Sequence, residues 1–173
     1  NDENNTYLQG LAVGKELRNY GINANFAPVL DVNNNPANPV IGARSYGENP
    51  FLVARYGVGL INGLRDSKVM ATSKHFPGHG NTSVDSHSGL PVITSSKEDL
   101  YKIELAPFIA SIGEGIDAIM TTHIIFTAID STLPATLSEK VLTNLLRNEL
   151  GYDGIIVTDG MEMGAIDKYF GTV

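Results

Sequence analysis

The sequence has no cysteine, no excess of basic residues and no long hydrophobic run. Without cysteine, it can form neither a disulfide framework nor a thiolate metal site. The formal net charge is −7 and the Lys and Arg residues are scattered, which argues against nucleic acid as the main partner because phosphate binding needs a basic face. No apolar run is long enough to span a bilayer, and the polar residues 1–6 do not resemble a signal peptide. The compartment stays open.

What the chain does contain is typical of a folded globular domain. It has 173 residues, of which 42% are hydrophobic and 18% are charged, enough for one domain with a real core. Helical patterns and short apolar strands alternate four times. The pattern predicts helices at residues 7–20, 50–66, 96–112 and 138–151, and strands at residues 24–31, 69–75, 118–123 and 154–159. The strands are rich in Val and Ile, as in a parallel sheet covered on both faces.

This alternation indicates an α/β fold, for which two architectures compete. A doubly wound dinucleotide-binding sheet would have a Gly-rich turn directly after its first strand. The best match, Gly57–Gly59 with Gly63, lies inside a helical pattern, and we interpret it as a mark of close helix packing. A TIM barrel instead carries its chemistry at the C-terminal ends of its strands, which fits this sequence better.

We therefore predict an incomplete (β/α)8 TIM barrel of about four consecutive βα units. Residues 1–173 would form a partial catalytic domain that lacks the flanking strands of the barrel. The four strands should be parallel and adjacent in chain order, so that their C-terminal ends converge on one rim. The residues at these ends are Asp31, Lys74–His75, His123 and Asp159.

All four histidines lie at strand ends or in the loop after the second strand, which favours a functional site over chance. His75, His79, Asp85 and His87 could supply metal ligands. Pro77 and Gly78 separate His75 from His79, however, so these two histidines do not form a helical zinc pair, and no HExxH motif is present. We predict no metal and no cofactor.

Acid/base chemistry is the second interpretation of these residues. Asp85 and His87 are two positions apart, so their side chains point the same way in an extended segment. A carboxylate beside an imidazole favours its protonated form, which makes a proton donor near neutral pH. A Ser-His-Asp hydrolase is not indicated, because the chain has no Gly-x-Ser-x-Gly nucleophile elbow.

Two aspartates follow apolar strands. Asp159 comes directly after the apolar residues 155–158 of a predicted strand. Burial of a carboxylate there costs free energy unless the group has a task or polar partners. The alternative for Asp159 is a helix cap, since a helical stretch follows it. Asp31 is followed by three asparagines, and we interpret it as an Asx turn that leads into residues 33–35.

These residues resemble the signature of a known family. The run Lys74–Gly80, followed by Asp85–His87 and Leu90-Pro91, is similar to that of bacterial β-N-acetylglucosaminidases in glycoside hydrolase family 3. Other motifs of that family resemble Asn25–Val32, Ile41–Gly47 and Gly154–Asp159. The resemblance covers essentially the whole chain. One departure is Asn81, where the family often has Asp and where we expect little effect.

The resemblance implies a retaining mechanism through a covalent glycosyl-enzyme. Asp159 would be the nucleophile, and His87, held by Asp85, would be the acid/base. The resemblance also implies sugar contacts, which we assign to Arg44, Lys74, His75 and His123. The implied substrates are N-acetylglucosaminides, including peptidoglycan-derived muropeptides. The family's upstream Asp-Gln-Glu-Gly-Gly strand is absent, so we expect that the missing strands are needed for activity.

Three alternatives stay open at this point. One is another β-glycosidase of family 3, although the β-glucosidases of that family have a different motif after Lys-His and lack the Asp-Ser-His triplet. Neutral imidazole does not repel an anionic acceptor, so phosphate could replace water and the reaction would then be phosphorolysis. A non-catalytic sugar-binding fragment is the third alternative, but binding alone needs no nucleophile.

Overall fold

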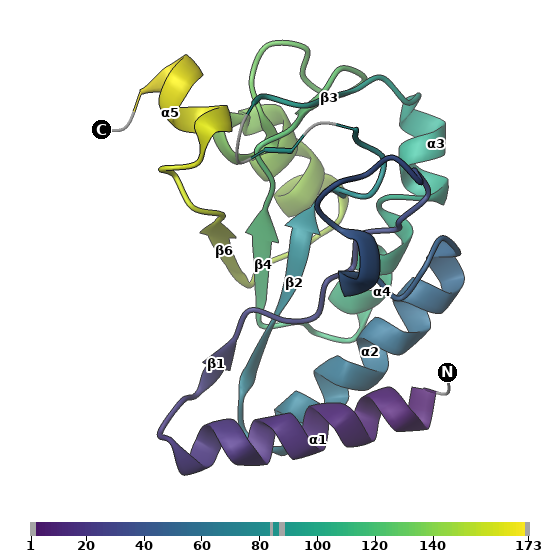
Figure 1. The fold of residues 1–173 in the computed structure, drawn as a ribbon, viewed down its shortest axis with the longest axis vertical. Helices are drawn as coiled ribbons and strands as arrows, with labels where there is room; N and C mark the ends of the chain where they lie inside the picture. Colours follow the sequence, from purple (N-terminus) through teal and green to yellow (C-terminus); the bar gives the residue numbers. More distant parts are fainter. Residues whose placement is uncertain (1–2, 84, 87–88, 172–173) are drawn as a thin grey trace.

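The computed structural model describes residues 3–83, 85–86 and 89–171 and shows a central parallel sheet (Figure 1). Its strand order is β1-β2-β4-β6, and all neighbours pair in parallel. The strands are β1 (Ala24–Asn25), β2 (Met70–Phe76), β4 (Ala118–Thr121) and β6 (Ile155–Thr158). The predicted α/β class and the predicted order of adjacent parallel strands are therefore confirmed.

Helices connect these strands, so the chain forms consecutive βα units of an incomplete barrel. The helices are α1 (Glu3–Asn19), η1 (Gly42–Arg44), α2 (Pro50–Asp66), α3 (Lys97–Lys102), α4 (Ala106–Gly113), η2 (Ala135–Leu137), the π-helix η3 (Lys140–Glu149) and α5 (Gly164–Phe170). In Figure 1, α1 lies below the sheet and α5 lies near the upper ends of the strands. No helix in the described ranges has the length and apolar character needed to cross a bilayer.

The hydrophobic core includes side chains of the sheet and of α2 and α4. Phe76 of β2 meets Phe108 of α4 edge to face, with ring centroids 5.3 Å apart, and both are fully buried. Leu60, Ile61 and Leu64 of α2 belong to the same cluster. Burying such side chains contributes roughly 1.5–3 kcal/mol each, so the core holds the strand ends, and the site residues on them, in place.

Glycines let α1 and α2 approach each other closely. A Cβ on Gly63 would overlap the carbonyl oxygen of Tyr7, and one on Gly10 would lie 2.5 Å from the carbonyl oxygen of Leu60. A Cβ on Gly59 would similarly collide with α1. The interpretation of the pattern as close helix packing is confirmed for Gly59 and Gly63, whereas Gly57 makes room for the side chain of Leu30.

Several predicted boundaries were wrong. The helix expected at residues 96–112 is two helices, because Pro107 has no N–H to continue the first one and opens α4. The strand expected at 24–31 is regular only at Ala24–Asn25 and continues through an isolated bridge from Val29 to Lys74. Pro28 lacks the donor that regular pairing requires there.

Two further details were not predicted. A second, two-stranded parallel sheet pairs β3 (Val92–Ile93) with β5 (Ile125–Phe126). Strand β6, expected to be buried on both faces, is partly open, and Ile155 is 52% exposed. The reason is that β6 is the edge strand of the sheet in the part of the chain described here.

Candidate active site at the C-terminal rim of the sheet

A cavity of about 210 Å³ lies at the C-terminal ends of the strands. Its lining includes Lys74 and His75 of β2 and Met120 of β4. Asp159, the residue after β6, and Arg44, at the end of η1, also line it. Phe26, Val40, His79 and Ser86 complete its lining. Two hollows of about 220 and 350 Å³ lie elsewhere, but among the described residues neither is lined by a histidine or by a strand-end carboxylate. The rim cavity is therefore the candidate active site.

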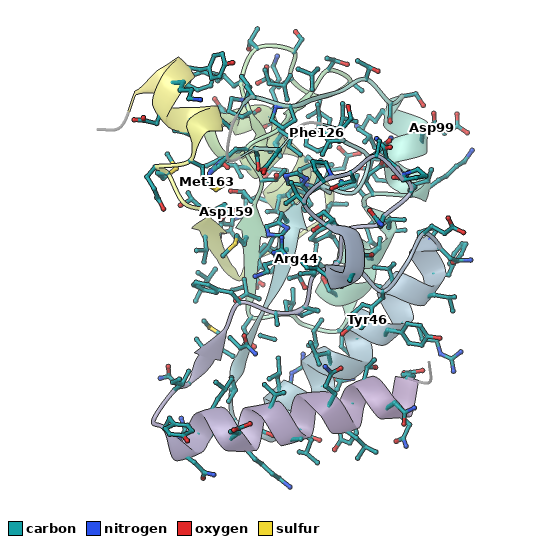
Figure 2. The ribbon with its side chains drawn as sticks, in the orientation of Figure 1. Arg44, Tyr46, Asp99, Phe126, Asp159 and Met163 are labelled. Atoms are coloured by element: carbon teal, nitrogen blue, oxygen red, sulfur yellow. The ribbon has the colours of Figure 1, made fainter. Side chains whose placement is uncertain are left out.

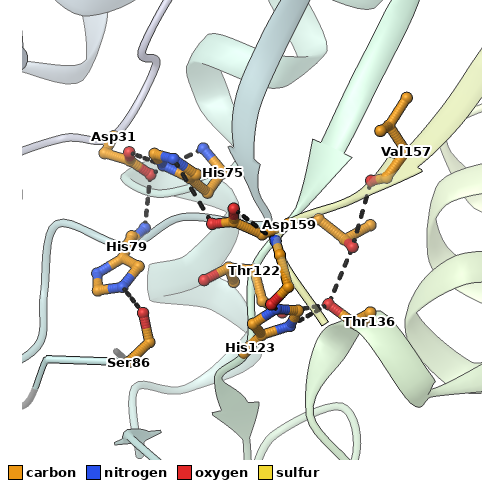
Figure 3. A network of polar contacts seen from close by, with 11 residues as sticks. Asp31, His75, His79, Ser86, Thr122, His123, Thr136, Val157 and Asp159 are labelled. Carbon is orange, nitrogen blue, oxygen red and sulfur yellow. Dashed lines mark hydrogen bonds and ion pairs between the residues drawn. The ribbon is translucent and has the colours of Figure 1, made fainter. Parts of the chain in front are cut away.

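Asp31 is the buried centre of this rim. Its Oδ2 lies 2.7 Å from His75 Nδ1, and its Oδ1 accepts hydrogen bonds from the backbone N–H groups of His75 and His79 (Figure 3). Burial alone would raise the pKa of Asp31, but the charge and hydrogen bond of His75 lower it below its usual value. The interpretation of Asp31 as an Asx turn was wrong, because its carboxylate binds His75 and His79, which are more than 40 positions away in the sequence.

The hydrogen bond to Asp31 sets the orientation of His75. A carboxylate accepts, so His75 Nδ1 carries a proton and Nε2 points away from Asp31. His75 Nε2 lies 4.0 Å from Asp159 Oδ2. His75 is 5% exposed, and its imidazole lies between two carboxylates, those of Asp31 and Asp159. It can thus present a ring nitrogen to a ligand beside Asp159.

Asparagine and serine side chains tie the loops of the rim together. Asn38 donates from Nδ2 to the carbonyl oxygens of His79 and Gly80, at 2.8 and 3.0 Å. Ser45 donates from Oγ to the carbonyl oxygen of Asp31 at 2.6 Å. A Cβ on Gly80 would overlap the carbonyl oxygen of Val32, so only glycine permits this approach. These contacts anchor the loop that carries Arg44.

Arg44 and Lys74 bring positive charge to the cavity that Asp159 enters. Figure 2 shows Arg44 and Asp159 near the upper ends of the strands. Burial lowers the pKa of Lys74, and Arg44 adds to this effect, whereas Asp159 and Asp31 oppose it. The side chain of Asp159 is 28% exposed, and its Oδ1 accepts a hydrogen bond of 2.8 Å from the N–H of Gly160. The carboxylate is therefore oriented and still accessible.

His79 connects the rim to the loop after β2. Its Nε2 lies 3.0 Å from Ser86 Oγ, and both side chains are buried. The N–H of Ala165, in α5, donates to the carbonyl oxygen of Ser86. Burial lowers the pKa of His79, although Asp31 works in the opposite direction. Ser86 therefore lies in the cavity wall, between the two residues of the predicted acid/base pair.

Of the predicted acid/base pair, only Asp85 belongs to the residues that the structure describes. His87 lies outside the described residues. Asp85 is half-buried, and its backbone carbonyl accepts a hydrogen bond from the N–H of Gly89. Within the described ranges, no group of three or more His, Cys, Asp or Glu residues is arranged to hold a metal ion.

His123 is on the predicted rim but is not among the residues that line the cavity. It is 1% exposed, and both ring nitrogens have partners. Nε2 lies 2.9 Å from the carbonyl oxygen of Gly160, and Nδ1 lies 2.8 Å from Thr136 Oγ1. The sugar contact that we predicted for His123 stays a prediction. Sequence reasoning also missed Thr136, because no motif or strand-end position marked it.

Taken together, the fold and the site define a (β/α)8-barrel protein with an acidic and cationic pocket at the C-terminal rim, which is where barrel enzymes carry their chemistry. The N-terminal domain of glycosyl hydrolase family 3 matches residues 1–173. The chain belongs to this family.

Known relatives support this assignment. A β-N-acetylglucosaminidase of family 3 from Paenibacillus sp. shares 54% identity with a TM-score of 0.97, and the match covers 98% of this chain and 32% of that one. Beta-hexosaminidase A of Pseudoalteromonas piscicida is 43% identical over 94% of this chain and 29% of its own length. NagZ of Neisseria gonorrhoeae is 39% identical with a TM-score of 0.87, over 94% of this chain and 47% of that one. The chain thus spans about a third to a half of these relatives.

Proposed function

We propose that this chain is part of the catalytic barrel of a retaining exo-β-N-acetylglucosaminidase. The observation that carries the proposal is the position of Asp159, whose carboxylate follows a barrel strand and enters the cavity beside Lys74 and His75. Relatives that bear the names β-N-acetylglucosaminidase and beta-hexosaminidase support the same substrate class. Residues 1–173 would be one part of a longer catalytic domain, as the length of these relatives suggests.

In this proposal, an oxygen of Asp159 attacks the anomeric carbon while the glycosidic bond breaks. His87 gives its proton to the departing oxygen, and Asp85 stabilises the charged ring. Water then attacks the glycosyl-enzyme, its proton passes to His87, and Asp159 leaves as a carboxylate. Ser86, which lies between Asp85 and His87 in the sequence, lines the cavity.

The polar groups around Asp159 would bind the sugar. Arg44, Lys74 and His75 line the same cavity and can donate hydrogen bonds to hydroxyl or acetamido oxygens. The cavity holds about 210 Å³ within this chain. We infer that the terminal N-acetylglucosamine of peptidoglycan-derived or related glycans occupies it.

A fluorinated sugar tests the nucleophile directly. A 2-fluoro or 5-fluoro glycoside should trap a covalent adduct, because fluorine destabilises the oxocarbenium-like transition state and slows turnover of the intermediate. Peptide mass spectrometry of the full-length protein should place the adduct on Asp159. Asp159→Asn should lower turnover by several orders of magnitude, whereas Asp153→Asn, a change at an exposed carboxylate before the same strand, should have no effect. An adduct on another residue would refute the assignment.

The acceptor distinguishes hydrolysis from phosphorolysis. One similar solved structure, 27% identical, is the beta-glucoside phosphorylase BglX. Phosphorolysis is therefore an alternative that the experiment must distinguish. Product analysis in phosphate buffer should show free N-acetylglucosamine. Sugar 1-phosphate as the main product would establish the phosphorylase alternative, and sugar binding without turnover would establish a non-catalytic role.

A further inference from the structure

We propose that His123 is a positioning residue that holds the Asp159–Gly160 segment through a hydrogen bond from its Nε2–H to the carbonyl oxygen of Gly160. This role rests on the proposed function of Asp159 as the nucleophile. It replaces the sugar contact that the strand-end position of His123 suggested.

The hydrogen-bond partners determine which nitrogen of His123 carries the proton. The carbonyl oxygen of Gly160 can only accept, so Nε2, at 2.9 Å, must donate. The neutral ring then has a bare Nδ1, which lies 2.8 Å from the hydroxyl of Thr136. The single proton of that hydroxyl is shared between Nδ1 and the carbonyl oxygen of Thr122, which lies 3.0 Å away. Burial lowers the pKa of His123 and so favours this neutral ring, although Gly160 and Asp159 oppose the shift.

Thr136 itself is held by β4 and the residue that follows it. Its Oγ1 lies 3.0 Å from Thr121 Oγ1 and 3.0 Å from the carbonyl oxygen of Thr122, and it is 5% exposed (Figure 3). Thr136 lies in η2, which directly precedes η3. A chain of hydrogen bonds therefore runs from η2 through His123 to the residue that follows the nucleophile.

The residue after Asp159 needs such an anchor. Glycine has more backbone freedom than any other residue, so Gly160 would not define its own conformation. Its N–H donates to Asp159 Oδ1 at 2.8 Å, and the N–H of Asp159 donates to the carbonyl oxygen of Thr121 at 3.3 Å. With Gly160 held by His123, Oδ1 stays engaged and Oδ2 faces the cavity, 4.0 Å from His75. His123 thereby orients the attacking carboxylate without touching the substrate.

The kinetics of His123 variants in the full-length protein test this role. His123→Ala should lower kcat by about 10–100-fold, the scale of a misplaced reacting group, and should leave KM within about threefold, because the sugar contacts are unchanged. Inactivation by the 5-fluoro sugar should slow to the same extent. His123→Gln keeps an N–H donor near the Nε2 position and should recover most of kcat. An equal decrease of kcat in His123→Ala and His123→Gln would overturn the proposal. So would an increase of KM with kcat unchanged.

Two further measurements guard against variants that fold poorly. Thr136→Ser keeps the hydroxyl and should have the kcat of the parent protein, whereas Thr136→Val should lower kcat. Thermal unfolding of both variants at the temperature of the parent protein would show that the fold is intact. Nitrogen NMR of the ¹⁵N-histidine-labelled protein should find the proton of His123 on Nε2. A proton on Nδ1 alone would overturn the hydrogen bond whether or not the protein is a glycosidase. Absence of turnover in the parent protein would instead refute the proposed function.

Discussion

Asp31 shows how one buried carboxylate can organise a whole rim. It is fully buried and contacts both His75 and His79, so it sets the ring orientation of the first and the backbone position of the second. A buried carboxylate with partners costs little, whereas removal of one partner leaves the others unsatisfied. Asp31 is therefore a structural support for the histidines that line the rim cavity.

Replacement of Asp31 should test this support with little change in shape. Asp31→Asn removes the charge, and its amide cannot accept from His75 Nδ1, His75 N and His79 N as a carboxylate does. We expect a loss of about 1–3 kcal/mol in the free energy of unfolding and a higher KM for the sugar. Chemical denaturation and steady-state kinetics measure the two effects. Asp153→Asn is the matched control, and equal behaviour of the two variants would contradict this role.

At the residue scale, a position at a strand end predicted which residues reach the rim, but not the role of each residue there. Lys74, His75 and Asp159 were predicted for the rim, and the cavity contains them. Sequence reasoning failed for Asp31 because three following asparagines suggested a turn, and the distant histidines that bind it are not visible as neighbours in sequence. The position of Asp31 at the end of a strand was the available signal.

Single elements followed their local sequence signals closely. Ser96 is a residue type that favours helix caps, and its Oγ accepts from the N–H of Asp99 at the start of α3. The error at residues 96–112 came from weighing the apolar periodicity above Pro107, which ends helices regardless of periodicity. The small sheet of β3 and β5 could not be predicted, because two-residue strands have no periodic pattern.

The close contact between α1 and α2 should depend on the absence of a side chain at Gly63. Gly63→Ala would place a methyl group against the backbone of α1, with the N of Leu11 only 2.6 Å away. The helices would have to separate, which should cost about 1–3 kcal/mol of stability. Gly113→Ala, at the exposed end of α4, meets nothing within 4 Å and should be neutral or gain up to about 1 kcal/mol. Thermal unfolding compares the pair, and equal stability would show that the close approach is unimportant.

In the whole molecule, the C-terminal ends of four strands lie on one side of the sheet. This arrangement was predictable because right-handed βα connections make consecutive strands parallel. The loops between the strands were less predictable. Their positions depend on contacts such as Asn38 with His79 and Ser45 with Asp31, which join segments far apart in sequence. Fold and strand ends therefore follow from local patterns, whereas the packing of the rim depends on long-range hydrogen bonds.

The stability of the whole molecule should depend on two buried histidines. Burial lowers the pKa values of both His79 and His123 below the ordinary value of about 6.5. As the pH falls below about 6.5, the unfolded chain binds protons at these positions and the folded protein does not. The free energy of unfolding should therefore be highest above that pH and should decrease between about pH 6.5 and about pH 5.

Thermal unfolding of the full-length protein across this pH range measures the effect. Replacement of His79 and His123 together by Gln removes both groups, so the dependence on pH should become flatter, even if the variant is less stable at neutral pH. Each single variant should flatten it in part, because the two rings titrate at separate sites. A parent protein whose stability is constant between about pH 7 and about pH 5, or a double variant that keeps the full slope, would show that these histidines do not carry the dependence.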